Sequence, residues 1–129
     1  MYSDDNLYDP YNIWNTFSGA FLRIPFLDNV ITDTHFHARE RMGRMLTFLA
    51  RITKGDAIEN QSTFDAKSYR AVALDEVTAL LLNVETGHAQ AVGENYAYIC
   101  QPSRVPEICE SDIPLTFKGN AFFLLGNLF

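Results

Sequence analysis

The chain has 129 residues, of which 47% are hydrophobic and 13% aromatic, so it is long enough for one domain with its own core and too short for two. Its formal net charge at pH 7 is −6, from 16 acidic and 10 basic residues. A general nucleic-acid binder normally carries a basic patch or stripe, so this balance argues against that class.

No run of about 18 uncharged apolar residues occurs, so we expect no membrane anchor. Residues 1–5 carry two aspartates and no base, the opposite of a signal peptide, and the default expectation is a cytoplasmic location. Cys100 and Cys109 flank a short span that contains two prolines. The sequence leaves open whether they form a disulfide or remain two reduced thiols.

The first part of the chain has little periodic pattern. Residues 1–15 are rich in Asp, Asn and Tyr, which predicts a loop or the end of an element. Residues 17–27 mix apolar side chains with one glycine and one proline, which indicates a buried connection. Residues 30–31 then begin a short buried strand that leads into Asp33 and His35.

Residues 38–53 are predicted to form an amphipathic helix. Apolar side chains recur there at helical spacing. They are Met42, Met45, Leu46, Leu49 and Ile52. Lys54 and Gly55 are typical of a helix end. Arg51 is expected on a solvated face, and residues 56–69 form a polar loop with a short helical turn.

The remainder is predicted to be mainly strands in a meander. The expected strands are 70–74, 78–84, 89–92 and 96–100, with turn residues at 85–87. A proline-bearing loop, residues 101–114, follows. It leads to a strand at 115–118 and an apolar end at 121–129.

The run from Asp33 to Arg44 carries the densest chemistry in the chain. His35 ends the strand-like stretch, and three arginines follow it closely. Histidine exchanges a proton near neutral pH, and arginine binds a carboxylate through two parallel hydrogen bonds. The run therefore favours chemistry on an acidic or carboxylate-bearing substrate.

A metal site is one interpretation of this run. His35 and His37 alternate like the His-x-His zinc pair of amidohydrolase barrels, because alternate strand residues share a side. Such a barrel needs further ligands over a chain of about 250 residues. The only other histidine is His88, in a predicted hairpin turn, so we expect no metal.

An acidic pair, Asp75 and Glu76, suggests a second interpretation. A carboxylate that orients an imidazole is what a Ser-His-acid hydrolase requires. The pattern Asp-x-His-Phe-x-x-Arg-x-Arg-x-Gly-Arg, followed by a helix, Asp-Glu-x-Thr-Ala-Leu and Val-Gly-x-x-x-x-Tyr, resembles the cyanophycinase and peptidase E family of serine peptidases. The resemblance covers roughly residues 20–100. It implies part of a three-layer α/β/α sandwich, with a mixed sheet and C-terminal β-hairpins.

The resemblance also implies roles for individual residues. His35 falls at the catalytic histidine, which takes the proton of a serine and returns it to the leaving amine. Glu76, in preference to Asp75, falls at the acid that orients it. The resemblance places five residues near the substrate: Asp33, Thr34, Arg39, Arg41 and Arg44. The planar guanidinium groups of the three arginines suit an aspartyl carboxylate of the substrate. The alternative is that some of these arginines pair with acidic residues of the chain and hold the loop.

Two departures from the family pattern affect what is expected. Thr34 replaces the glutamine that precedes the family's histidine, which favours an aspartyl or isoaspartyl peptide other than cyanophycin. The family's Gly-x-Ser-Ala-Gly nucleophile elbow does not occur in the sequence. Ser18 is not expected to replace it, because a nucleophile elbow follows a buried strand and no apolar run precedes Ser18.

Residues 1–129 are therefore expected to be a single domain, the C-terminal portion of a peptidase that lacks its nucleophile half. The first hypothesis is a serine-type peptidase without a cofactor, acting on aspartate-containing peptides and inactive until its missing half or a homodimer partner completes it. The alternative is a non-catalytic remnant that serves as a binding or assembly module.

Overall fold

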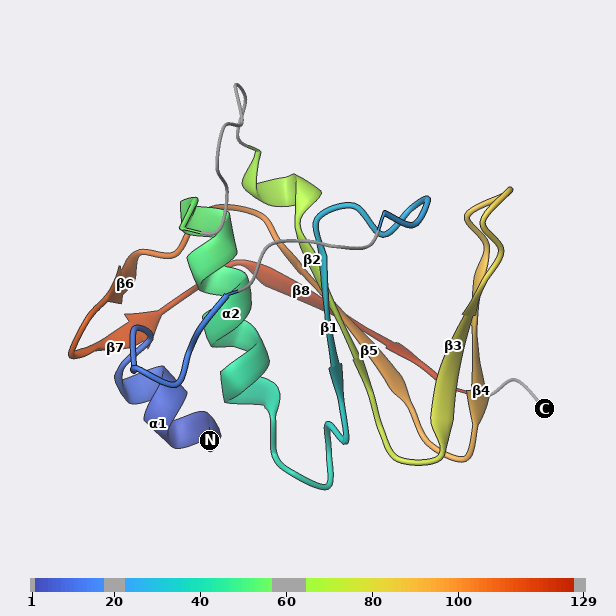
Figure 1. Cartoon of the computed structure of the whole chain (residues 1–129), viewed down its shortest axis with the longest axis horizontal. Helices are drawn as coiled ribbons and strands as arrows, with labels where there is room; N and C mark the ends of the chain where they lie inside the picture. Colours follow the sequence, from blue (N-terminus) through green and yellow to red (C-terminus); the bar gives the residue numbers. More distant parts are fainter. Residues whose placement is uncertain (1, 18–22, 57–64, 127–129) are drawn as a thin grey trace.

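The computed structural model describes residues 2–17, 23–56 and 65–126. Over these ranges the chain forms two α-helices, one 3-10 turn and eight strands (Figure 1). The helical elements are α1 (Ser3–Tyr8), α2 (Met42–Lys54) and η1 (Ala66–Ser68). The strands are β1 (Val30–Thr34), β2 (Arg70–Leu74), β3 (Thr78–Leu82), β4 (Ala89–Gly93), β5 (Ala97–Pro102), β6 (Ile108–Glu110), β7 (Ile113–Thr116) and β8 (Asn120–Leu125).

Strands β1, β2, β5 and β8 form one mixed sheet, in that order. β1 and β2 are parallel, with Asp33 opposite Ala73, and the other two pairs are antiparallel. A parallel pair needs a long crossover, and the chain from β1 to β2 makes it through α2. The pairs β3–β4 and β6–β7 lie at opposite ends of the molecule (Figure 1). This arrangement confirms the predicted α/β class with a mixed sheet and antiparallel C-terminal hairpins.

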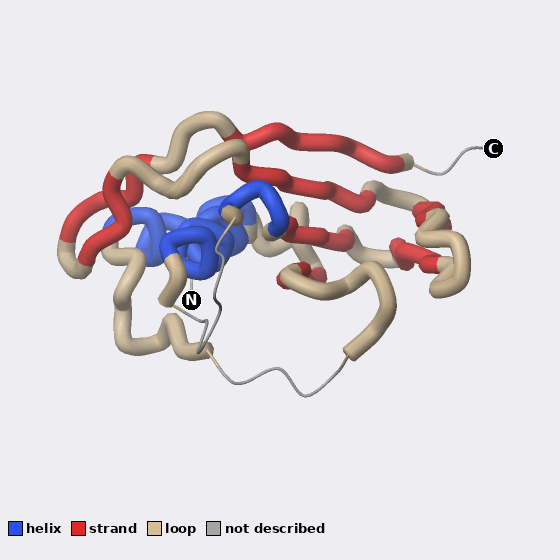
Figure 2. Tube along the Cα trace, turned by 90° about the horizontal axis from the view of Figure 1, so that it is seen from above, coloured by secondary structure: helices blue, strands red, loops and turns tan. Residues whose placement is uncertain are grey.

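The core lies between α2 and one face of the four-stranded sheet (Figure 2). In α2, Met45, Leu49 and Ile52 recur every three or four residues and are buried. Ala71 and Ala73 of β2 are fully buried against them, and these small side chains let the helix approach the sheet closely. Phe36, Tyr69 and Cys100 complete the cluster.

The opposite face of the sheet carries a row of apolar side chains. Val72 lies between Ala71 and Ala73, so its side chain leaves the α2 side. Ile99 pairs with Val72 across β2 and β5, and Phe123 pairs with Ile99 across β5 and β8. Val72 and Ile99 are half-buried, whereas Phe123 is 53% exposed. An apolar row therefore crosses three strands on the side away from α2.

The helix α1 occurs where the sequence predicted a loop or the end of an element. It has no apolar stripe of its own, and a helix this short is unstable alone in water. It is held by α2, because the Thr47 hydroxyl donates to the Asn6 carbonyl at 3.1 Å. Gly43 leaves space for α1, since a Cβ there would come within 2.7 Å of Ser3 and 2.8 Å of Leu7. Tertiary contacts, not a local pattern, stabilise this helix.

The helix α2 begins at Met42 and not at residue 38 as predicted. Glu40 has a φ of 48°, a left-handed conformation that a right-handed helix does not contain. Met42 is 37% exposed, so it does not belong to the buried stripe. The predicted end at Lys54 and Gly55 is confirmed, because α2 ends at Lys54 and Gly55 adopts the left-handed C-cap conformation with a φ of 105°.

The predicted meander of consecutive strands is wrong. Among the described residues, β3 and β4 pair only with each other, while β5 returns to β2. The predicted loop 101–114 also contains the β6 strand and the start of β7. Pro114 is tolerated in β7, because among the described residues this strand pairs only with β6 and leaves its other edge free of ladder hydrogen bonds.

The predicted buried connection at 17–27 is wrong at residues 23–26, whereas Phe17 is half-buried and packs against the core cluster. Residues 23–26 are exposed, and residues 18–22, which include the rejected nucleophile Ser18, lie outside the described residues, as do residues 57–64. The predicted strand at 30–31 is present as β1. It is half-exposed and not buried, because β1 lies at the edge of the sheet.

Arg51 does not lie on a solvated face. Its guanidinium lies 4.5 Å from the centroid of the Tyr11 ring and 4.7 Å from that of Phe17. Its Nη1 also donates to the Asn15 carbonyl at 2.6 Å. These contacts attach the segment after α1 to the C-terminal half of α2.

Cys100 and Cys109 are free thiols, and both are buried. Burial raises the pKa of Cys100 to about 12 and that of Cys109 to about 11. Both side chains therefore remain protonated at neutral pH, which makes them poor nucleophiles.

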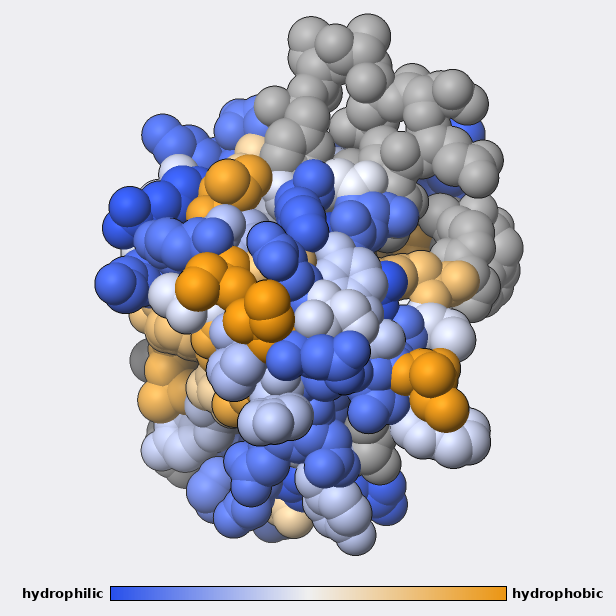
Figure 3. All heavy atoms as spheres, turned by 90° about the vertical axis from the view of Figure 1, so that its left-hand side faces the viewer, coloured by the Kyte–Doolittle hydropathy of each residue, from blue (hydrophilic) through white to orange (hydrophobic). Residues whose placement is uncertain are grey.

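The end of the molecule that carries α1 and the β6–β7 pair is mainly hydrophilic (Figure 3). Its hydrophobic groups form separate spots among polar side chains, which is normal for a protein surface. Within the described ranges, no helix has the length and apolar character needed to cross a bilayer.

Candidate active site

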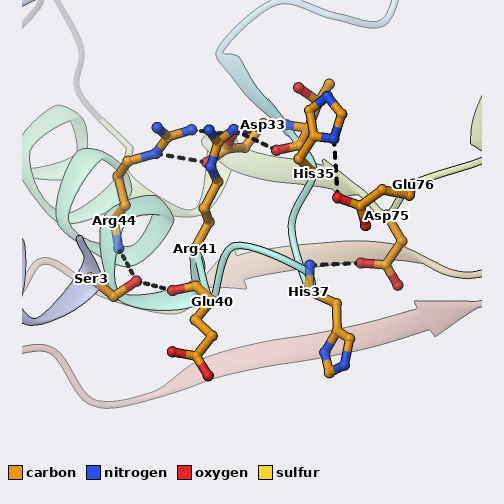
Figure 4. A network of polar contacts seen from close by, with 10 residues as sticks. Ser3, Asp33, His35, His37, Glu40, Arg41, Arg44, Asp75 and Glu76 are labelled. Carbon is orange, nitrogen blue, oxygen red and sulfur yellow. Dashed lines mark hydrogen bonds and ion pairs between the residues drawn. The ribbon is translucent and has the colours of Figure 1, made fainter. Parts of the chain in front are cut away.

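The candidate site lies at the carboxyl ends of β1 and β2, where His35 and Glu76 follow the two strands. Because these strands are parallel, residues that follow them lie at the same edge of the sheet, as in open α/β sheets that place their ligands there. The His35 Nδ1 and Glu76 Oε1 atoms are 3.0 Å apart (Figure 4). The fold therefore joins two side chains that are 41 positions apart in the sequence.

The other ring nitrogen of His35 faces away from this contact. Among the described residues, Nε2 has no hydrogen-bond partner, and the His35 side chain is 53% exposed. A carboxylate at Nδ1 favours the tautomer with the proton on Nδ1, so Nε2 carries the lone pair that accepts a proton. The geometry makes Nε2 available as a general base.

The electrostatics of Glu76 agree with this contact. The pKa of Glu76 lies below its ordinary value, first because its own backbone N–H hydrogen-bonds the carboxylate and then because the His35 side chain does so. The carboxylate is therefore ionised at neutral pH. An ionised acid beside Nδ1 stabilises the imidazolium that forms when Nε2 takes a proton.

The backbone is strained at His35 and at the residue that follows Glu76. His35 has a φ of 52°, and Val77, next to Glu76, has a φ of 54°, which is unusual for a β-branched residue. The Glu76–Val77 turn is held by Asn95, whose Nδ2 donates to the Glu76 carbonyl at 2.7 Å. Gly93 packs so closely there that a Cβ would lie 2.1 Å from the Val77 oxygen. Such strain concentrates at functional sites and persists only where neighbours enforce it.

Asp75, the first member of the acidic pair, does not contact the His35 ring in this arrangement. It is 7% exposed, and its Oδ1 accepts the backbone N–H of His37 at 2.8 Å. Its Oδ2 accepts the Tyr98 hydroxyl at 3.0 Å. The two adjacent carboxylates therefore have different partners, with Glu76 on the imidazole and Asp75 on the backbone that follows it.

Arg41 and Arg44 both bind the Asp33 carboxylate (Figure 4). Arg44 Nε donates to Asp33 Oδ2 at 3.1 Å and Arg44 Nη2 to Asp33 Oδ1, a two-point pairing. Arg41 Nη1 donates to Asp33 Oδ1 at 3.2 Å and to the Thr34 carbonyl at 2.6 Å. These contacts fix the start of α2 to the end of β1, and substrate binding by Asp33, Arg41 and Arg44 stays a prediction.

Arg39 differs from the other two arginines. It is exposed, and among the described residues it makes no ion pair. It lines an open cavity of about 710 Å³. The other lining residues are Tyr2, His37, Ala38, Glu40, Arg41 and Arg44. The cavity lies on the loop that follows His35, so Arg39 is a cation available to an acidic ligand there.

Thr34 contributes backbone to this site, and its exposed side chain is predicted to meet substrate. Its carbonyl accepts Arg41, and its N–H donates to Asp33 Oδ1 at 2.8 Å. The nucleophile is not placed, because no described hydroxyl hydrogen-bonds the His35 ring. Ser3, near Arg44, is already engaged by the Glu40 carbonyl and the Arg44 N–H (Figure 4).

The two histidines of the His-x-His pair point in different directions (Figure 4). His35 faces Glu76, whereas the His37 ring extends away from that contact. Over residues 2–17, 23–56 and 65–126, no group of three or more His, Cys, Asp or Glu side chains is arranged to hold a metal ion. His88 is exposed beside the β3–β4 turn, far along the chain from both.

Two residues at the site had no role assigned from the sequence. Tyr98 is the tyrosine of the Val-Gly-x-x-x-x-Tyr pattern, and Asn95 lies inside that pattern. The pattern itself was the available signal. Their roles depend on β5 returning to pair with β2, which the sequence did not reveal.

No protein-family model matches this chain, and no curated protein is significantly similar to it.

Proposed function

We propose that this chain carries the acid-base half of a serine-type peptidase site, resembling the cyanophycinases, that hydrolyses aspartyl or β-aspartyl peptide bonds. The observation that carries the proposal is the 3.0 Å contact between His35 Nδ1 and Glu76 Oε1, together with an accessible Nε2 that has no hydrogen-bond partner among the described residues. This is the arrangement by which a carboxylate prepares an imidazole to activate a hydroxyl nucleophile.

The reaction would proceed by acyl transfer. His35 Nε2 takes the proton of a serine while its oxygen attacks the peptide carbonyl, and the same proton goes to the leaving amine as the C–N bond breaks. Water then attacks the acyl-enzyme, with His35 again accepting and returning the proton. Glu76 stabilises the imidazolium in both halves of the reaction.

Arg39 supports an acidic substrate. It is the cation of the 710 Å³ cavity for which no ion pair is present among the described residues, whereas Arg41 and Arg44 are paired with Asp33. A guanidinium pairs with a carboxylate through two parallel hydrogen bonds. We propose that Arg39 contacts the substrate carboxylate and that the Asp33 cluster holds the loop that presents it.

The serine is proposed to come from a segment that adds to the sheet beside β1. One edge of β1 pairs with β2, and no strand among the described residues pairs with the other edge. A parallel strand there would end beside His35, since carboxyl ends of parallel strands share one edge. A second helical layer on the Val72, Ile99 and Phe123 row would complete a three-layer sandwich.

The first test is genetic and then chemical. The reading frame before residue 1 is expected to encode Gly-x-Ser-Ala-Gly, and protein that includes this segment should hydrolyse β-aspartyl dipeptides and react with a serine-directed phosphonate. His35→Ala should lower kcat/KM by at least about 10³-fold, because the base is lost.

His88→Ala is the matched control for that variant. It removes an exposed imidazole beside the β3–β4 turn, outside the lining of the 710 Å³ cavity, so activity should stay near that of the parent. Unchanged hydrolysis in His35→Ala would refute the proposed function, as would an active preparation that the phosphonate does not label.

A binding or assembly module is the second candidate. The absence of a Gly-x-Ser-Ala-Gly elbow from the sequence and the exposed apolar side chains Phe122, Phe123 and Leu124 on β8 favour it. An upstream frame without the elbow, combined with a homodimer in sedimentation that Phe123→Asp dissociates, would support this candidate over the peptidase.

A further inference from the structure

The loop that follows His35 is fastened at two backbone positions. The Phe36 N–H donates to the Leu74 carbonyl at 3.1 Å, which continues the contact of β1 with β2. The next N–H, that of His37, donates to Asp75 Oδ1 at 2.8 Å. His35 therefore lies between the end of a strand and two fixed amides, with a φ of 52° that L residues rarely adopt.

Asp75 is fixed in turn by β5. Its Oδ2 accepts the Tyr98 hydroxyl at 3.0 Å, and its backbone N–H donates to the Tyr96 carbonyl at 3.1 Å. The Tyr98 ring packs on the Phe36 ring, with centroids 4.8 Å apart and planes tilted by 48°. A polar link through Asp75 and an apolar link through Phe36 thus reach the same loop from one tyrosine.

The burial of these groups makes the arrangement stiff. Asp75 is 7% exposed and Phe36 is 3% exposed, so water has little access to replace a lost partner. A buried carboxylate without donors is costly, and the His37 and Tyr98 donors satisfy both oxygens. Removing either donor should therefore loosen the loop instead of leaving it in place.

We infer that Asp75 and Tyr98 are positioning residues, which hold residues 35–37 so that the His35 Nδ1 meets Glu76 and Nε2 faces outward. The inference rests on the proposed function for its catalytic consequence, but the contacts themselves are independent of it. It separates the two adjacent acids by task. Glu76 acts on the imidazole, and Asp75 acts on the backbone through hydrogen bonds that an uncharged amide is able to replace.

The test uses ¹⁵N-labelled imidazoles in the chain itself, with His35 assigned by His35→Ala. In the parent, the neutral His35 ring should be present as the tautomer that carries its proton on Nδ1. Glu76→Gln shows how the His35 nitrogen resonances change when the partner of Nδ1 is altered. Asp75→Ala should lose the tautomer preference. Asp75→Asn should keep it, because the amide oxygen accepts the His37 N–H and the amide N–H₂ donates to the Tyr98 oxygen.

Tyr98→Phe keeps the ring on Phe36 and removes only the hydroxyl, so it should shift the His35 nitrogen resonances part of the way towards those of Glu76→Gln. Tyr96→Phe is the matched control, because it removes the hydroxyl of a tyrosine that is 47% exposed and lies two residues before Tyr98. It should leave His35 unchanged. Circular dichroism establishes which variants are folded.

Each outcome decides the inference. His35 resonances that are unchanged in folded Asp75→Ala would overturn it, and if that variant does not fold, unchanged resonances in Tyr98→Phe would do so. Asp75→Asn resonances that match Glu76→Gln would also overturn it, since the charge of Asp75 would then act on the ring directly.

In an active preparation, Asp75→Ala should lower kcat by about 10²-fold with little change in KM, as a misplaced base does, while Asp75→Asn restores most of it. Failure of the proposed function would appear as hydrolysis that does not depend on His35. Failure of the positioning inference would appear in the imidazole spectra whether or not the chain takes part in hydrolysis.

Discussion

At the scale of single residues, the candidate site depends on a few side chains that each make a distinct contact. Glu76 meets the His35 ring, Asp75 meets the following backbone, and Asp33 joins two arginines. The identity of these residues was evident in the sequence, because unusual residue types cluster in the motif. The resemblance favoured Glu76 over Asp75 as the partner of His35, but nothing in the sequence predicted that Asp75 binds the following backbone, because the geometry of the turn decides where each adjacent side chain points.

The Glu76 carboxylate, which accepts its own backbone N–H and contacts His35, should contribute to the pH dependence of folding. The pKa of Glu76 is lowered in the folded state, so this contribution to the free energy of unfolding is complete above the ordinary value of 4.5 and is lost as the pH falls through the lower folded value. Glu76→Gln should therefore flatten the acid side of the stability profile, measured by urea unfolding at a series of pH values.

Glu85→Gln removes the same charge in the β3–β4 turn and is the control for net charge. It should keep the acid slope of the parent more closely than Glu76→Gln does. Equal slopes in the parent and Glu76→Gln would contradict the lowered pKa of Glu76 in the folded state.

At the scale of elements, α2 is the clearest success of sequence reasoning. Its apolar spacing and its glycine end are local features, and the buried side chains Met45, Leu49 and Ile52 follow the predicted stripe. Its start was misplaced because the left-handed Glu40 and the turn after His35 are imposed by contacts with β2 and β5. α1 was missed for a related reason, since it is stabilised by packing on α2 and not by a pattern of its own.

Leu49→Ala should test the packing of α2 on the sheet. Leu49 is fully buried between the helix and β2, so its truncation should lower the free energy of unfolding by about 2–5 kcal/mol, through lost burial and a cavity. Met42 is 37% exposed at the start of the same helix, so Met42→Ala should lower the free energy of unfolding by less than about 1 kcal/mol. Urea unfolding of both variants measures the difference, and equal losses would contradict the packing described.

At the scale of the whole molecule, one long helix and a mixed sheet enclose a small core, and two free thiols are buried within this fold. Two features are visible only in the assembled sheet: the apolar row on its other face, and the edge of β1 with which no strand in the described part of the chain pairs. Both distinguish this fold from a set of independent hairpins.

The buried thiols give a measurement of global folding. Cys100 and Cys109 should be unreactive towards a thiol reagent in native protein at neutral pH, and both should react in denaturing urea. Because burial raises their pKa values from the ordinary 9.0 to about 12 and about 11, the folded state keeps protons that the unfolded state loses. Stability should therefore fall as the pH rises above about 9.

The thiol count in urea provides the check on redox state. Two reactive thiols are expected without prior reduction, in agreement with the free cysteines. Reaction that appears only after a reductant is added would show a disulfide and contradict the structure.

The sequence by itself determined the local features of this protein: the α2 stripe and its Gly55 end, the β2 strand, and a motif in which His35, Glu76 and the arginines are prominent. These depend on residue type and short-range spacing. Only the tertiary structure decided that β5 returns to β2, that α1 packs on α2, and that His35 meets Glu76 across 41 positions. Such contacts depend on which surfaces bury each other best over the whole chain, and no short window of sequence contains both partners.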